Sequence, residues 1–177
     1  MLDFNLHIKP IVKDTFVLTG KINDSTLLEK LKKDIDKGVK KNNNNYKTNV
    51  HGKMTAFKYF NKNNDFIKLI DILKPYFHKV TKKSIELKDS WGNILEGEDF
   101  VYPHDHFPSI VSGVVYLTKG EGTYFHHYDY TIEAEVGSFV LFDPAIPHEV
   151  KKTYLKKKRY TLAFNFDMVS DYKDLPQ

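Results

Sequence analysis

Three histidines of this sequence have the residue type and spacing that metal chemistry requires. His104 and His106 stand two residues apart in the segment YPHDHFPS, and His148 follows in DPAIPHEV. In an extended segment, residues i and i+2 lie on the same face, so both imidazoles of the first segment can reach one ion. The third imidazole follows a proline-stiffened turn. The three would form a facial ligand set that leaves an octahedral ion with open positions.

Asp105, between the first two histidines, is an alternative ligand. In a regular extended segment its side chain points to the opposite face, but a bend in the backbone would turn the carboxylate toward the metal. Two ligand sets therefore remain open at this point. One consists of the three histidines, and the other has Asp105 as a ligand together with one neighbouring histidine.

The other five histidines have ordinary explanations. His7, His51 and His78 lie in the N-terminal part of the chain without an obvious partner, and we interpret them as structural. His126 and His127 are adjacent on an expected strand, so their side chains point to opposite faces and at most one faces inward. Both are left outside the expected metal site.

Arg159 is the only arginine among the 27 lysine and arginine residues of the chain. A planar guanidinium binds a carboxylate through two parallel hydrogen bonds, which an ammonium group cannot do. It follows His148 by eleven residues, about one strand and its return, and is therefore expected in the same barrel, close to the metal. Thr161 shares its strand face and can reach the same carboxylate. The alternative is an arginine retained by chance at a solvated strand end.

Two further side chains are candidates for the same pocket. Tyr116 shares a strand face with Ser112 and Val114 in SGVVYL, and its phenol is a third hydrogen-bond donor. Asn93 shares a face with Trp91 on the preceding strand. Simple core packing is the alternative for each of them.

A β-rich C-terminal half must position these residues. From Ser84 onward, short runs with period-two patterning recur about every eight to twelve residues, a cadence typical of an all-β sandwich or barrel. These runs are SIELKDSW, SIVSGVVYL, GTYFHHYDY, TIEAEV, SFVLFD, HEVKK and RYTLAFNF. We predict a mainly β fold, a double-stranded β-helix (jelly roll), with a lysine-rich hairpin over residues 151–158 interpreted as a solvated surface.

The N-terminal part predicts two supporting helices outside this core. A strand-like stretch over residues 4–18 precedes a helix that starts at a capping box of Thr26 and Glu29 and ends at Gly38 or just beyond. A second helix is expected from Asp65 to Val80. We predict one domain over residues 1–177, with a mixed flank (1–83), a jelly-roll core (84–168) and a loosely held tail (169–177).

Composition restricts the class of protein. A hydrophobic fraction of 41% and a charged fraction of 28% are those of a globular domain, and cysteine is absent, which excludes disulfides, thiolate metal sites and a cysteine nucleophile. The net charge of +4 permits an acidic partner without requiring nucleic acid. No apolar run suggests a signal peptide or a membrane span, so we expect a soluble, cytoplasmic protein that does not bind membranes.

Taken together, these motifs resemble the iron(II)/2-oxoglutarate-dependent dioxygenases. Their pattern is H-x-D/E, a strand ending in Tyr-Leu, a distal histidine and then R-x-S/T, matched here in order by His104 to His106, SGVVYL, His148 and Arg159 to Thr161. The phrases WGNIL, HDHFPSIVSGVVYL, GSFVLFDPAIPHEV and RYTLAFNF resemble more narrowly a group of small bacterial and phage oxygenases related to prolyl hydroxylases. The resemblance runs from about Asn49 to Phe166.

The resemblance implies a hydroxylase that consumes 2-oxoglutarate and O2 and releases succinate and CO2. Iron(II) would be held by three ligands, and the far carboxylate of 2-oxoglutarate would be bound in the pocket behind them. The implied metal ligands are His104, His106 and His148, and the implied co-substrate residues are Arg159, Thr161, Tyr116 and Asn93. Position 106 departs from the family, because most members have a carboxylate there; an all-histidine site leaves the iron more positive.

Two other classes of protein use similar residues. A cupin-type enzyme with three histidines acts without 2-oxoglutarate, but it gives Arg159 no role, and its usual glutamate ligand is missing because Glu121 is expected in a turn. A non-catalytic jelly-roll binding module leaves the imidazoles unexplained. The substrate, whether a peptide, a nucleobase or a small metabolite, and the oligomeric state, a homodimer included, are not determined by the sequence.

Overall fold

The computed structural model describes residues 15–42, 48–152 and 156–169, and the structural statements below refer to these ranges. Most of the strand expected over residues 4–18 and most of the expected tail fall outside them, as does His7. The described part of that stretch enters strand β1 (Val17–Lys21), which ends later than expected.

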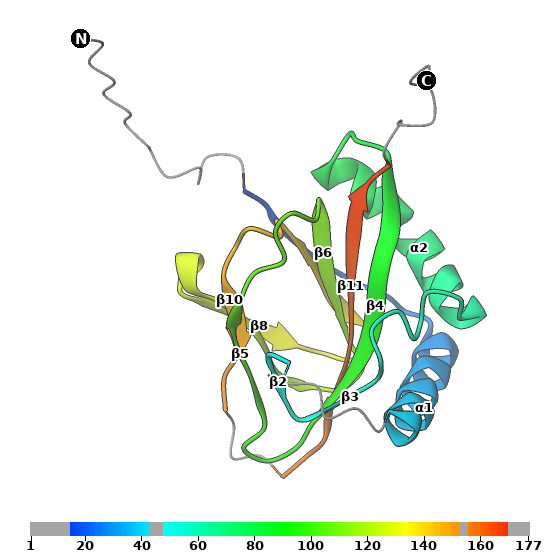
Figure 1. Cartoon of the computed structure of the whole chain (residues 1–177), viewed down its shortest axis with the longest axis vertical. Coiled ribbons are helices and arrows are strands. Elements are labelled where there is room, and N and C mark those ends of the chain that lie inside the picture. The colour runs from blue at the N-terminus through cyan, green and yellow to red at the C-terminus, as the bar shows by residue number, and fades with distance from the viewer. Residues whose placement is uncertain (1–14, 43–47, 153–155, 170–177) are drawn as a thin grey trace, which may run out of the picture.

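Two antiparallel sheets form a double-stranded β-helix, as predicted (Figure 1). The larger sheet has the order β1, β9 (Ser138–Phe142), β6 (Val111–Tyr116), β11 (Arg159–Met168), β4 (Ile85–Leu95) and β3 (Lys53–Met54). The smaller sheet has the order β2 (Val50–His51), β5 (Phe100–His104), β10 (His148–Val150), β7 (Gly120–Phe125) and β8 (Tyr130–Ala134). Strand β5, which carries the first histidine, is absent from the sequence-based strand prediction.

Two helices cover the outer face of the larger sheet, as expected (Figure 1). Helix α1 spans Ser25–Lys41 and helix α2 spans Asn64–Val80. The capping box predicted for α1 is wrong: the side chain of Asp24 accepts the hydrogen bond from the Leu27 backbone N–H at 2.9 Å. Asp24 therefore caps the helix, two residues ahead of the predicted cap Thr26. Neither helix combines the length and the hydrophobicity needed to cross a membrane within the described ranges.

The two faces of strand β11 explain how one sheet serves both a core and a site. Leu162, Phe164 and Phe166 point away from the smaller sheet and are buried among the side chains of the two helices. The alternate residues face the smaller sheet, as the pleat requires. The apolar side chains on one face of β11 thus pack the sheet against the helices, where a buried Phe contributes about 3–5 kcal/mol to stability. The opposite face of the sheet remains available for polar groups.

Three local predictions for the second half of the chain are wrong. The hairpin expected over residues 151–158 does not join paired strands, because β10 and β11 belong to different sheets; residues 153–155 themselves lie outside the described ranges. Glu121 lies on strand β7 and not in a turn. His126 and His127 lie in a short 3-10 helix (His126–Tyr128) that interrupts the strand expected there. Local periodicity does not report which strands pair or where a strand starts and is interrupted.

Candidate functional site

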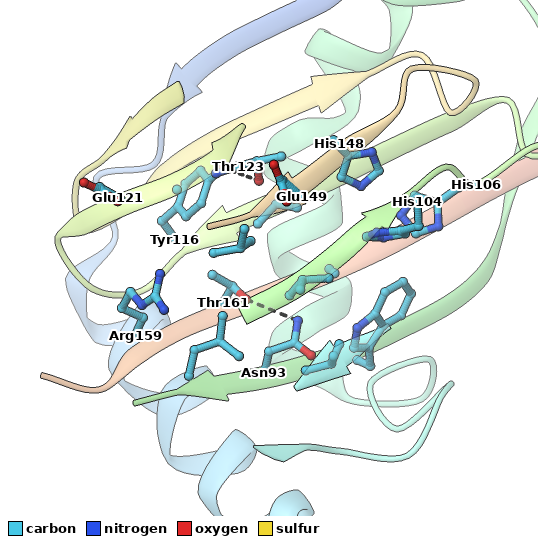
Figure 2. A pocket seen from close by; sticks show the side chains of 18 residues that line it. Asn93, His104, His106, Tyr116, Glu121, Thr123, His148, Glu149, Arg159 and Thr161 are labelled. Atoms are coloured by element: carbon cyan, nitrogen blue, oxygen red, sulfur yellow. Dashed lines mark hydrogen bonds between the residues drawn. The ribbon is translucent and has the colours of Figure 1, made fainter. Parts of the chain in front are cut away.

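The three histidines singled out in the sequence come together between the sheets (Figure 2). His104 ends β5 and His148 begins β10, and the two are direct partners in the strand register. His106 follows β5 and is held by a hydrogen bond from its backbone N–H to the Pro144 carbonyl at 2.8 Å. One nitrogen from each ring lies within 4.8 Å of the other two.

Asp105 is not part of this cluster. Its Oδ1 accepts a hydrogen bond from the Phe107 backbone N–H at 3.1 Å, and the residue is exposed. The carboxylate is therefore used to shape the turn after β5. The same turn carries His106 inward, so the structure groups the three histidines and leaves the aspartate outside.

Backbone carbonyls select the tautomer of two of the imidazoles. Nδ1 of His104 lies 2.7 Å from the Tyr102 carbonyl oxygen, and Nδ1 of His148 lies 2.9 Å from the Ile146 carbonyl oxygen. A carbonyl can only accept, so each Nδ1 must carry the proton. Each Nε2 is left with a free lone pair, which is the arrangement typical of metal-ligating histidines.

Burial keeps these imidazoles uncharged. Desolvation lowers the pKa of His106 and of His148 to about 3, and the neighbouring His104 adds to the effect for both. The pKa of His104 is also lowered by desolvation, although its hydrogen bond to Tyr102 opposes the shift. The aromatic rings of Phe142 and Phe125 pack against His148, with centroids 4.6 and 6.0 Å away. Neutral nitrogen donors in a dry surrounding suit a divalent transition metal.

Arg159 lies at the other end of the same pocket (Figure 2). Only 6% of the residue is exposed. Its Nη2 donates to the Asp99 carbonyl at 2.7 Å, whereas its buried Nε and Nη1 have no hydrogen-bond partner among the described residues. Desolvation lowers the pKa of Arg159, opposed by the charges of Glu121 and Asp99. A buried guanidinium with two unpaired donors is costly unless an anion completes it.

The polar residues predicted beside Arg159 also line this pocket. Asn93, Thr161 and Tyr116 are neighbours across β4, β11 and β6 in the strand register. The Asn93 amide donates from Nδ2 to the Thr161 hydroxyl at 3.3 Å, and its buried Oδ1 has no partner among the described residues. The structure therefore brings Arg159, Thr161, Asn93 and Tyr116 into one cavity with the histidine cluster.

Tyr116 has a more specific environment than the sequence suggested. Its hydroxyl donates to Thr123 Oγ1 at 2.8 Å and accepts from the Thr123 backbone N–H at 3.1 Å. Burial raises the pKa of Tyr116 to about 12. The phenol therefore keeps its proton and donates it in the hydrogen bond to Thr123. The hydroxyl proton of Thr123 remains free for a hydrogen bond to a group in the pocket.

Sequence reasoning missed several pocket residues on the smaller sheet. Glu121 and Thr123 line the pocket from β7, and Glu149 lines it from β10. Glu149 forms an ion pair with His126, with Nε2 and Oε1 3.3 Å apart. The period-two alternation of Glu121, Thr123 and Phe125 is a signal that could have found the first two. His51 and His78 remain outside the cluster, as expected.

Comparison with known proteins gives a consistent picture at the level of the fold. No protein-family model matches the sequence, and no curated protein matches it significantly. Among solved structures, a prolyl-4-hydroxylase from Pseudomonas putida is 16% identical with a TM-score of 0.67, covering 89% of this chain and 94% of its own.

Two further solved structures are similar. The viral collagen prolyl hydroxylase vCPH from Paramecium Bursaria Chlorella virus-1, in a 2-oxoglutarate complex, is 12% identical with a TM-score of 0.66, covering 89% of this chain and 98% of its own. HygX from Streptomyces hygroscopicus, with nickel and 2-oxoglutarate bound, is 12% identical with a TM-score of 0.66, covering 88% and 83%. The chain thus has the fold of 2-oxoglutarate oxygenases.

Proposed function

We propose that this protein is an iron(II)- and 2-oxoglutarate-dependent oxygenase of the hydroxylase type. The observation that carries the proposal is the pairing, in one pocket, of three convergent neutral imidazoles with a buried Arg159, two of whose nitrogens find no partner within residues 15–42, 48–152 and 156–169. An oxygenase of this class needs a metal site and, behind it, a receptor for a carboxylate. The fold shared with the prolyl hydroxylases supports the proposal.

The residues of the chain divide the work between them. His104, His106 and His148 hold the iron through nitrogen atoms that the backbone has oriented. Arg159 binds the far carboxylate of 2-oxoglutarate with two adjacent N–H groups, one on the unpaired Nε or Nη1 and the other the second N–H of Nη2, and Asp99 keeps the guanidinium oriented. When bound, iron and 2-oxoglutarate supply the oxidising chemistry, in which O2 and 2-oxoglutarate yield succinate, CO2 and an oxidised substrate.

Three neutral side chains complete the co-substrate pocket. Thr161 offers its hydroxyl beside Arg159, and Asn93 holds that hydroxyl from the neighbouring strand. Tyr116 forms a wall and orients Thr123, because its only proton is already donated there. We assign direct contact with the carboxylate to Arg159 and Thr161. Asn93 and Tyr116 act mainly by holding their hydroxyl partners.

Neither rival class gains a supporting observation. The glutamate that usually joins the three histidines of a cupin-type site is missing from the cluster found in the described residues. Glu121 and Arg159 line the same pocket, and the charge of Glu121 raises the pKa of Arg159, opposing the effect of burial. A binding module without a metal does not explain why three imidazoles converge in the interior.

Anaerobic titration tests the proposal directly. The protein is loaded with iron(II) under argon, 2-oxoglutarate is added in a calorimeter, and air is then admitted while succinate is measured. We expect metal-dependent binding of 2-oxoglutarate followed by slow succinate release without any added substrate. Metal binding without 2-oxoglutarate binding would favour the cupin class, and failure to bind metal would favour the binding module.

A further inference from the structure

We propose that the substrate of this site carries a cationic nitrogen, an ammonium or a guanidinium on an aliphatic chain, and that Asp89 is the residue that binds it. The inference rests on the proposed function and extends it to the class of substrate. It comes from a second cavity that lies beside the histidine cluster and is lined by His104 and His106 but not by Arg159.

The inner face of the larger sheet is layered along β11. Arg159 occupies one end, the Thr161 layer comes next, and Ala163 follows with its register partners Trp91 and Val114. The ring of His106 packs on Trp91, with centroids 6.0 Å apart. Trp91 lines both cavities, so the co-substrate pocket and the second cavity meet at this layer.

Asp89 belongs to the next layer, on the far side of Trp91 from Arg159. Its register partner is Asn165, whose own partner on β6 is Ser112. Successive layers on one strand face are about 7 Å apart, twice the rise per residue. A carbon placed at the metal side of Trp91 is therefore only a few bonds from a nitrogen held by Asp89.

A buried hydrogen-bond relay fixes the orientation of Asp89. The Ser112 hydroxyl donates to Asn165 Oδ1 at 2.7 Å, and Asn165 Nδ2 donates to Asp89 Oδ1 at 2.9 Å. Ser112 and Asn165 are 1% and 5% exposed. The other oxygen of Asp89, Oδ2, has no hydrogen-bond partner among the described residues and is an acceptor in a cavity that Asp89 lines. A rigid carboxylate with a spare acceptor is suited to binding a donor.

The charges around Asp89 favour a cation over an anion. Lys88 lines the same cavity, but its Nζ lies 3.2 Å from Asp167 Oδ2 and 3.5 Å from the Ser109 hydroxyl, so its charge is matched. Asp105, a second carboxylate, also lines the cavity. Burial raises the pKa of Asp89 even though Asn165, Lys88 and Lys58 oppose the shift. A bound cation would relieve this cost of burying the carboxylate.

Aromatic rings form the apolar walls of this cavity. Phe57 and Phe107 are 53% and 76% exposed, unusually open for phenylalanine, and both line it together with Trp91. Phe57 packs edge-on against Trp91, with centroids 5.2 Å apart. Aromatic faces next to a carboxylate bind both the aliphatic stem and the charge of an alkylammonium or guanidinium group.

Matched probe pairs test the class of substrate. The Nα-acetyl amide of L-arginine is compared with that of the uncharged L-citrulline, and the Nα-acetyl amide of L-lysine with that of the uncharged L-norleucine, in calorimetric titrations of the full chain, metal-free and with manganese and 2-oxoglutarate bound. We expect each cationic probe to bind about tenfold more tightly than its neutral partner, the usual scale for a charge-assisted hydrogen bond. Equal affinities within both pairs would overturn the inference.

Asp89→Asn supplies the variant test. The substitution removes the charge but keeps an oxygen for Asn165, and Glu133→Gln removes the same charge from the exposed edge strand β8 as a control. We expect Asp89→Asn to lose the preference for cationic probes, while Glu133→Gln retains it. Both variants should keep the wild-type affinity for 2-oxoglutarate. Unchanged cation preference in Asp89→Asn would refute the role of Asp89.

The two proposals fail in different ways. If 2-oxoglutarate binds and is consumed but no cationic probe is preferred, the oxygenase proposal stands and the substrate class is wrong. If cationic probes bind through Asp89 in the metal-free protein but 2-oxoglutarate does not bind to the metal-loaded protein, the cation site stands and the oxygenase proposal fails.

Discussion

Arg159 donates a hydrogen bond from Nη2 to the Asp99 carbonyl at 2.7 Å, and its buried Nε and Nη1 have no partner in the part of the chain that the structure describes. This contact explains why the single arginine of the chain stands here. A lysine could supply the charge, but it could not bond Asp99 and at the same time present two parallel donors to a carboxylate.

Arg159→Lys is therefore expected to weaken 2-oxoglutarate binding about tenfold to a hundredfold, the range for losing part of a charged two-point contact. Calorimetry on manganese-loaded protein measures the effect, with metal content as the control because Arg159 lies away from the histidines. Wild-type affinity in this variant would remove the proposed role of the guanidinium.

His148→Ala should abolish metal retention, because it removes one of three ligands and leaves a gap beside Phe142 and Phe125. The measurement is the metal-to-protein ratio after dialysis, determined by elemental analysis. His78→Ala, at an exposed position on α2, is the matched control and should retain the metal. Equal metal content in the two variants would contradict the proposed site.

His106→Ala and Asp105→Asn distinguish the two ligand sets. We expect the first variant to lose metal and the second to keep it, because the asparagine oxygen can still accept the hydrogen bond from the Phe107 N–H. Metal affinity is measured by competition with a chelator of known affinity. The opposite outcome, with loss in Asp105→Asn only, would reinstate the carboxylate ligand.

The metal-free protein should lose stability in mildly acidic solution. The pKa values of His106 and His148 are about 3 in the folded chain, below the ordinary value of 6.5. Above pH 6.5 both states are neutral at these positions; as the pH falls toward 3, the unfolded chain binds protons that the folded chain excludes. Each histidine then lowers the free energy of unfolding by up to about 1.4 kcal/mol per pH unit.

Urea unfolding of the metal-free protein at pH 7 and pH 5 measures this dependence. In His148→Asn the free energy of unfolding should fall less between pH 7 and pH 5, because the unfolded variant has one histidine fewer to protonate. His78→Ala should behave as wild type. A free energy of unfolding that does not change between these two pH values would show that the imidazoles are not desolvated in the folded protein.

Much of the candidate site was predictable because strands repeat every two residues. The alternation in RYTLAFNF puts Arg159 and Thr161 on one face, and the H-x-H spacing predicted two converging imidazoles, although His106 reaches the cluster from the turn after β5. The type of each residue then indicates its chemistry, a solitary guanidinium for a carboxylate and three imidazoles for a metal. The jelly-roll fold and its two helices followed from the same periodicities.

Only the tertiary structure decided which groups are already satisfied and which are free. The choice of His106 over Asp105 depends on the Pro144 carbonyl, and the proton of Tyr116 goes to Thr123 on the smaller sheet. The layer of Asp89, Asn165 and Ser112 exists because β4, β11 and β6 pair in one register. Local sequence patterns report which face a side chain occupies, but partners across strands are set by long-range pairing, which those patterns do not encode.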